Sequence, residues 1–205
     1  MNTFTKRGEI AGPAGPLSVA VDTTTDVSTR GLAVICHPHP LQGGTMDNKV
    51  VTTIARALTQ RGWRVVRFNY RGVGGSAGAW DEGRGEVDDA LAVVAAHRVA
   101  GEALVLGGFS FGGYIAASAA AKLPEGEKAQ RLVLVAPSTV KHTAPPVPDD
   151  TLLVHGEADD VVPLSASMDW ARPQSLPVVV VPGAGHFFHG QLVLLKALVL
   201  RNFAE

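Results

Sequence analysis

Ser110 lies in a short segment whose residue types suit covalent catalysis. The segment Gly108-Phe-Ser-Phe-Gly112 follows an apolar run that begins at Leu104, and helix-forming residues follow it from Tyr114 onward. A serine at the apex of a tight strand-to-helix turn is pushed out of the sheet, and the residues two positions away must be small. The turn also points the first N–H groups of the helix at the group that the serine attacks. Although Ser110 could simply cap the helix, this context favours a nucleophile.

A serine hydroxyl needs a histidine base, and that histidine needs an acid to hold its tautomer. With this type of turn, the residues follow the chain order serine, acid, histidine. The predicted strand 151–155 leads into a loop with three carboxylates, Glu157, Asp159 and Asp160. Each would lie at the carboxyl edge of the sheet, so the pattern alone leaves the acid open among them.

Two histidines follow the last predicted strand, 176–181. His186 is preceded by the small residue Gly185 and lies nearer the end of that strand. His189 falls three residues later, in the first turn of a helix predicted over 189–202. We therefore expect His186 to be the base.

Attack on an acyl group creates a negative oxygen that needs two N–H donors. The residue after the nucleophile, Phe111, supplies one of them. The other is expected in the loop 37–41, which follows the first central strand, 31–36. The two prolines of this loop have no N–H, which leaves His39 or Leu41. We favour His39.

A zinc site is the alternative use of His37 and His39, which are two residues apart on an extended segment. It would need a third ligand such as Asp47 or His189, and no metalloenzyme motif connects these residues. The chemistry is therefore expected to need no metal and no organic cofactor.

The composition is that of an ordinary globular chain. Its 205 residues, 46% apolar and 18% charged, are enough for one domain over 1–205. A net charge of −1 gives no electrostatic reason to expect nucleic acid or a membrane surface as a partner. The segment 1–8 lacks the apolar stretch of a signal peptide, and no apolar run is long enough to span a bilayer. The single Cys36 fits a reducing compartment, so a cytoplasmic location is expected.

Strands and helices alternate along the chain after an N-terminal hairpin. This order predicts an α/β fold with a mostly parallel sheet of about eight strands, covered by helices on both faces. Ligands bind at the carboxyl ends of the strands in such folds, and each motif above follows a strand. The expected strands are 3–10, 17–23, 31–36, 63–70, 131–136, 151–155, 176–181 and the run from 104, and the expected helices are 48–60, 86–99, 165–172, 189–202 and the segment after Ser110.

Five motifs spread over nearly the whole chain resemble those of the small, single-domain α/β-hydrolases of the dienelactone-hydrolase-like kind. They are His37-Pro-His-Pro-Leu-Gln-Gly-Gly-Thr-Met-Asp-Asn-Lys-Val50, Phe68-Asn-Tyr-Arg-Gly-Val-Gly-Gly-Ser76, Gly107-Gly-Phe-Ser-Phe-Gly-Gly113, His155-Gly-Glu-Ala-Asp159 and Gly185-His-Phe-Phe188. The resemblance favours Asp159 as the acid. Dienelactone hydrolases themselves carry cysteine where this chain has Ser110, which favours ordinary serine esterase chemistry. The resemblance thus implies a serine carboxylesterase; thioesterase, acyltransferase and peptidase activities, or a non-catalytic binding protein, are the alternatives.

Larger members of the fold insert a helical lid where this chain has only the short segment 137–150. An open cleft suited to a small-molecule ester, apolar or aromatic, is therefore expected. An exposed edge strand of such a sheet could also pair in a homodimer. The glycine-rich loop 71–78 is expected to be structural, with Arg71 paired to Asp88 or Asp89. The expected substrate-binding residues are Leu41, Trp80, Met168 and Phe187, with Phe111 and Phe188 as further apolar lining.

Overall fold

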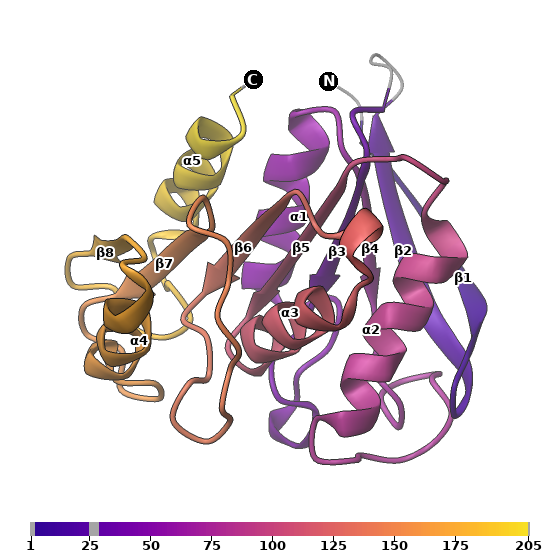
Figure 1. Ribbon diagram of the computed structural model, residues 1–205, viewed down its shortest axis with the longest axis horizontal. Helices are drawn as coiled ribbons and strands as arrows, with labels where there is room; N and C mark the ends of the chain where they lie inside the picture. Colours follow the sequence, from indigo (N-terminus) through magenta and orange to yellow (C-terminus); the bar gives the residue numbers. More distant parts are fainter. Residues whose placement is uncertain (1–2, 25–28, 205) are drawn as a thin grey trace.

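An eight-stranded sheet with helices on both faces forms the protein (Figure 1). The computed structural model describes residues 3–24 and 29–204. Residues 1–2 of the N-terminal segment and 25–28 of the expected loop 22–30 lie outside the described residues. The strands are β1 (Thr3–Gly12), β2 (Gly15–Thr24), β3 (Leu32–Cys36), β4 (Arg64–Phe68), β5 (Leu104–Phe109), β6 (Arg131–Val135), β7 (Leu152–Gly156) and β8 (Val178–Val181). The α-helices are α1 (Lys49–Gln60), α2 (Arg84–His97), α3 (Phe111–Lys122), α4 (Leu164–Ala171) and α5 (Leu192–Asn202).

The strand order is β1-β2-β4-β3-β5-β6-β7-β8. Strands β3 to β8 run parallel, and the β1–β2 hairpin joins β4 in antiparallel fashion. Every residue of β3 and β5 is buried, as continuous apolar runs at the centre of a two-sided sheet must be. The predicted α/β-hydrolase fold is confirmed.

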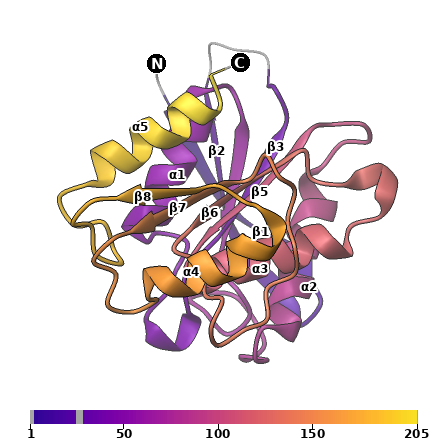
Figure 2. The same cartoon turned by 60° about the vertical axis from the view of Figure 1, so that its left-hand side comes forward.

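Helices cover the sheet in two layers, which Figure 2 shows from the side. On one face, α1 and α5 pack against the sheet around Ile54, Leu58 and Leu195. On the other face, α2 and α3 pack around Val93 and Ile115. Two apolar cores, one on each face, hold the strands whose ends carry the site.

Several predicted boundaries differ from the observed ones. The hairpin strands extend through most of the expected connection 11–16, because Gly12 pairs with Gly15 around a two-residue turn. The last helix begins at Leu192, not at His189, since Gly190 has a left-handed backbone (φ 75°) that an α-helix does not allow. His189 therefore lies in the turn before the helix.

The strand order reverses direction between β3 and β5. The chain leaves β3 toward β4 on one side and returns to β5 on the other, so the loops after β3 and β5 meet at the carboxyl edge. A side chain at Gly112 would collide with the carbonyl groups of Cys36 and His37. The start of α3 thus lies directly against the loop that carries His39.

Candidate active site

Ser110 occupies a backbone conformation that few non-glycine residues adopt, with φ 57° and ψ −121°. Its N–H donates to the Val135 carbonyl (2.9 Å), and its own carbonyl accepts from the N–H groups of Gly113 (2.9 Å) and Ser138 (3.0 Å). A side chain at Gly108 would collide with the Gly112 carbonyl. Strand, turn and helix are therefore held in the strained geometry that the sequence pattern predicted.

This strain should be measurable as stability. The free energy of unfolding of Ser110→Gly should be about 1 kcal/mol higher than that of Ser110→Ala, because glycine adopts this conformation without a Cβ penalty. Urea denaturation of the two variants, which both lack the hydroxyl, measures the difference. Equal or lower stability of the glycine variant would show that the turn stores no strain.

His186 links Ser110 to Asp159. Its Nε2 lies 3.0 Å from the Ser110 Oγ, and its Nδ1 lies 2.7 Å from the Asp159 Oδ2. All three residues are buried, and the imidazole ring packs against Phe109 with 4.8 Å between ring centroids. The structure thus brings together the serine, the histidine and the aspartate that the sequence predicted as a set.

Asp159 is more strongly held than a solvated loop carboxylate would be. Its Oδ1 accepts from the N–H groups of Val161 (2.9 Å) and Val162 (2.8 Å). Burial alone would raise the pKa of this carboxyl, but hydrogen bonds from His155, His186 and the Val162 N–H outweigh burial and hold the pKa below its usual range. Asp159 is therefore ionised at neutral pH.

His155 is a contact of Asp159 that the sequence alone does not predict. Its Nε2 lies 3.3 Å from the Asp159 Oδ2 and 2.9 Å from the Val162 carbonyl. Its place at the end of β7, four residues before Asp159, is the signal that could have indicated the contact. The other two acid candidates lie elsewhere: Asp160 is exposed, and Glu157 accepts from the Gly183 N–H (2.9 Å).

The backbone N–H groups of Phe111, His39 and Leu41 are the candidate donors to the negative oxygen. Phe111 is the first residue of α3, and Leu41 lies in the short 3₁₀ helix η1 (Pro40–Gln42) that His39 precedes. Within the described residues, none of these three N–H groups donates to a backbone carbonyl outside its own helix. The choice of His39 over Leu41 stays a prediction.

His37 has a structural role. Its Nδ1 lies 2.7 Å from the Pro38 carbonyl, and its Nε2 accepts from the Tyr70 N–H (3.2 Å). Burial lowers its pKa to about 3 against the opposing effect of the Pro38 hydrogen bond, so the ring is neutral. With both ring nitrogens occupied, and Asp47 paired to Arg7 and Arg67, the residues of the alternative zinc site do not converge. The described residues include no cluster of three or more His, Cys, Asp or Glu side chains that could hold a metal ion.

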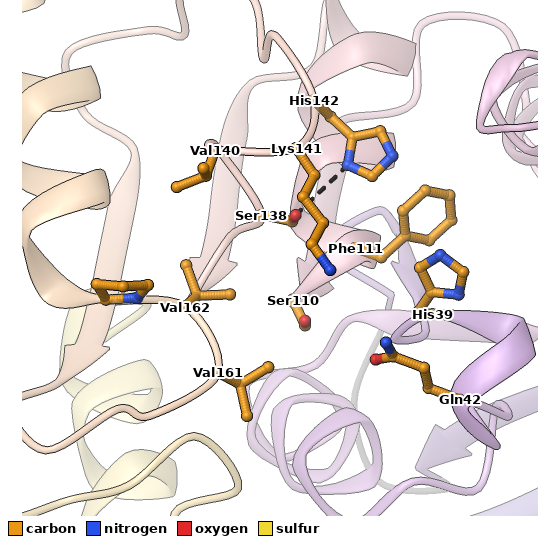
Figure 3. A pocket seen from close by; sticks show the side chains of 11 residues that line it. His39, Gln42, Ser110, Phe111, Ser138, Val140, Lys141, His142, Val161 and Val162 are labelled. Atoms are coloured by element: carbon orange, nitrogen blue, oxygen red, sulfur yellow. Dashed lines mark hydrogen bonds between the residues drawn. The ribbon is translucent and has the colours of Figure 1, made fainter.

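A cavity of about 160 Å³ opens beside Ser110 (Figure 3). One wall comes from the loop after β6, which is too short for a lid domain but folds over the carboxyl edge of the sheet. The lining residues are His39, Gln42, Ser110, Phe111, Ser138, Val140, Lys141, His142, Val161, Val162 and Pro163. Of these residues, His39, Ser110 and Phe111 are predicted for the site by the sequence, whereas those from the loop after β6 are not.

The four expected substrate-binding residues do not line this cavity. Leu41, Met168 and Phe187 are exposed, by 70%, 39% and 43%. Trp80 packs behind the cavity wall, with its ring centroid 4.6 Å from that of His39 and 5.2 Å from that of Phe111. Contact of these residues with a substrate stays a prediction. Of the two further lining candidates, Phe111 lines the cavity and Phe188 is fully buried.

The loop 71–78 is held by internal contacts. Arg71 forms an ion pair with the buried Asp89, at 2.8 Å between Nη2 and Oδ1, which confirms one of its two expected partners. Ser76 Oγ donates to the Asn69 carbonyl (2.8 Å) and accepts from the Ser18 N–H (3.0 Å). These contacts fit the structural role expected for the loop.

The fold and the serine turn together define the class of the protein as a lidless α/β serine hydrolase. Within that class, residues 28–150 match the model of the family described as serine aminopeptidase, S33, and the chain belongs to that family. None of the helices in residues 3–24 and 29–204 is long and apolar enough to cross a membrane.

Solved structures and a curated protein are also similar to this chain. An α/β serine hydrolase without a lid from Xanthomonas campestris is 39% identical, with a TM-score of 0.88 over 100% of this chain and 95% of that chain. An α/β serine hydrolase homologue from Coxiella burnetii is 42% identical, with a TM-score of 0.87 over 96% of each chain. An uncharacterised protein of Rickettsia prowazekii (strain Madrid E) is 33% identical in a match of 192 aligned positions that covers 86% of this chain and 79% of that protein.

Proposed function

We propose that the protein is a carboxylesterase that hydrolyses small esters through an acyl-enzyme. The observation that carries this proposal is the hydrogen-bonded chain from Ser110 Oγ through His186 to the ionised Asp159. A serine hydroxyl within 3.0 Å of an imidazole nitrogen can lose its proton as it attacks, and a carboxylate on the other nitrogen stabilises the imidazolium that forms.

The reaction runs in two steps. The Ser110 oxygen bonds to the ester carbonyl carbon, and His186 passes the serine proton to the alcohol as the carbon–oxygen bond of the ester breaks. The N–H groups of Phe111 and His39 stabilise the negative oxygen of each tetrahedral intermediate. Water, deprotonated by His186, then releases the acid and restores Ser110. Side chains, backbone N–H groups and water suffice for this sequence of steps.

Aminopeptidase activity is the second candidate, because the family description names it. An aminopeptidase must hold a positively charged α-amino group next to the reacting carbonyl. The cavity beside Ser110 is instead lined by the exposed Lys141 side chain, and none of the described residues that line it is acidic. Repulsion between two ammonium groups disfavours that substrate class. Thioester hydrolysis and acyl transfer would use the same residues.

The test compares ester and amide substrates at neutral pH. The enzyme should hydrolyse p-nitrophenyl esters with acyl chains of two to six carbons, with activity falling for longer chains that the small cavity cannot hold. It should turn over aminoacyl p-nitroanilides at least 100-fold more slowly. The reverse preference would replace the esterase proposal with the aminopeptidase one, and turnover of neither substrate would contradict both.

A further inference from the structure

Lys141 is a charged side chain that lines the cavity beside Ser110. The proposed reaction does not use it. In Figure 3 its ammonium group extends from the loop after β6 toward the centre of the cavity, on the side of Ser110. No carboxylate of the described residues lies within ion-pair distance of it. A cation directed into a small cavity without an acidic partner favours an anionic ligand there.

The other polar groups of the cavity are neutral and can donate hydrogen bonds to a ligand. His142 lines the cavity with its Nδ1 3.4 Å from the Ser138 Oγ, and the Gln42 amide lies on the opposite wall (Figure 3). The His39 Nδ1 is buried and has no hydrogen-bond partner among the described residues. Burial and the nearby Lys141 charge lower the pKa of His39, and burial, His39 and Lys141 lower that of His142. Both rings are therefore neutral at neutral pH, and Lys141 is the charged group among the residues that line the cavity.

The position of His186 indicates which part of an ester enters the cavity. The alcohol leaves past the group that protonates it, which is His186, whereas the acyl group stays on Ser110. His186 is absent from the lining of the cavity, which Ser110, Phe111 and the loop after β6 form. This arrangement favours the acyl group, which stays on Ser110, as the part of the ester that occupies the cavity.

We propose that the natural substrate is a half-ester of a short dicarboxylic acid, whose free carboxylate binds the Lys141 ammonium. This inference rests on the proposed esterase function and specifies its substrate class. Ser110 takes up the acyl group, the alcohol leaves with the proton from His186, and water releases the dicarboxylate. The acyl group is then charged at its far end, in contrast to the apolar or aromatic one that the sequence led us to expect.

The experiment measures kcat/KM for two esters of nearly equal shape, monoethyl glutarate and ethyl pentanoate, by acid release in a pH-stat. The ratio of the charged to the neutral ester should fall roughly fivefold to tenfold in Lys141→Met, because the carboxylate loses its ionic partner. It should fall further in Lys141→Glu, where the new charge repels the substrate. Lys122→Met removes the same charge at the far end of α3 and should leave the ratio within twofold of that of the parent.

The outcomes separate this inference from the proposed function. Turnover of both esters with a ratio that neither Lys141 variant lowers would overturn the assignment of Lys141 and leave the esterase proposal intact. An equal fall of the ratio in Lys122→Met would also overturn it, since the effect would then come from the total charge. Failure to turn over either ester, together with an unreactive Ser110, would overturn both proposals.

Discussion

Replacing Ser110 with alanine is expected to lower kcat for p-nitrophenyl acetate by about 10⁶-fold, because the bond-forming oxygen is removed. The substitution is expected to leave the rest of the turn unchanged. The backbone hydrogen bonds of the turn remain, and within the described residues the Ser110 hydroxyl hydrogen-bonds only to His186 Nε2, at 3.0 Å. Steady-state release of p-nitrophenolate measures the fall in kcat.

Ser118→Ala is the matched control, because Ser118 lies two turns further along the same helix, α3. It should retain the parent kcat within twofold. If Ser110→Ala kept more than a hundredth of the parent activity with correct folding, a nucleophile other than Ser110 would have to act.

Replacing Asp159 with asparagine should lower kcat for the same ester by about 10⁴-fold. The carboxylate accepts from His186 Nδ1 at 2.7 Å, which leaves Nε2 free to accept the proton of Ser110. An amide at this position can donate to Nδ1, hold the wrong tautomer and leave the imidazolium without a counter-charge. The two shapes are nearly the same, so the fall in kcat reports charge and tautomer.

Asp160→Asn tests the neighbouring carboxylate, which is exposed. Its kcat should stay within twofold of the parent value. A large fall in the Asp160 variant, with little change in the Asp159 variant, would reverse the assignment of the acid.

Local patterns predicted most of the fold. The apolar runs that became β3 and β5 are buried on both faces, and their composition alone indicates central strands. Turns with unusual backbone angles were harder to predict. The start of α5 was placed too early because a helical pattern does not show that Gly190 has a left-handed conformation. Similarly, the hairpin turn was predicted too long because pairing between Gly12 and Gly15 depends on register.

The functional site likewise has residues that the sequence predicted and residues that it did not. Ser110 and His186 each follow a strand at fixed points of the chain order, so the pattern predicted both of them, whereas the choice of Asp159 among three neighbouring carboxylates came from the family resemblance. The wall that the loop after β6 adds to the cavity could not be predicted, because Lys141 belongs to a loop without periodicity whose path depends on packing over the sheet edge. Apolar type alone suggested Leu41 as lining, yet it lies on the surface.

Intact mass after exposure to a fluorophosphonate tests the central claim, that Ser110 is an activated nucleophile. The parent protein should gain one phosphonyl group, and Ser110→Ala should gain none. Asp159→Asn should label much more slowly than the parent. No adduct on the folded parent, or an equal adduct on the Ser110→Ala variant, would contradict the account, and a binding protein with a hydrolase fold would then be the better description.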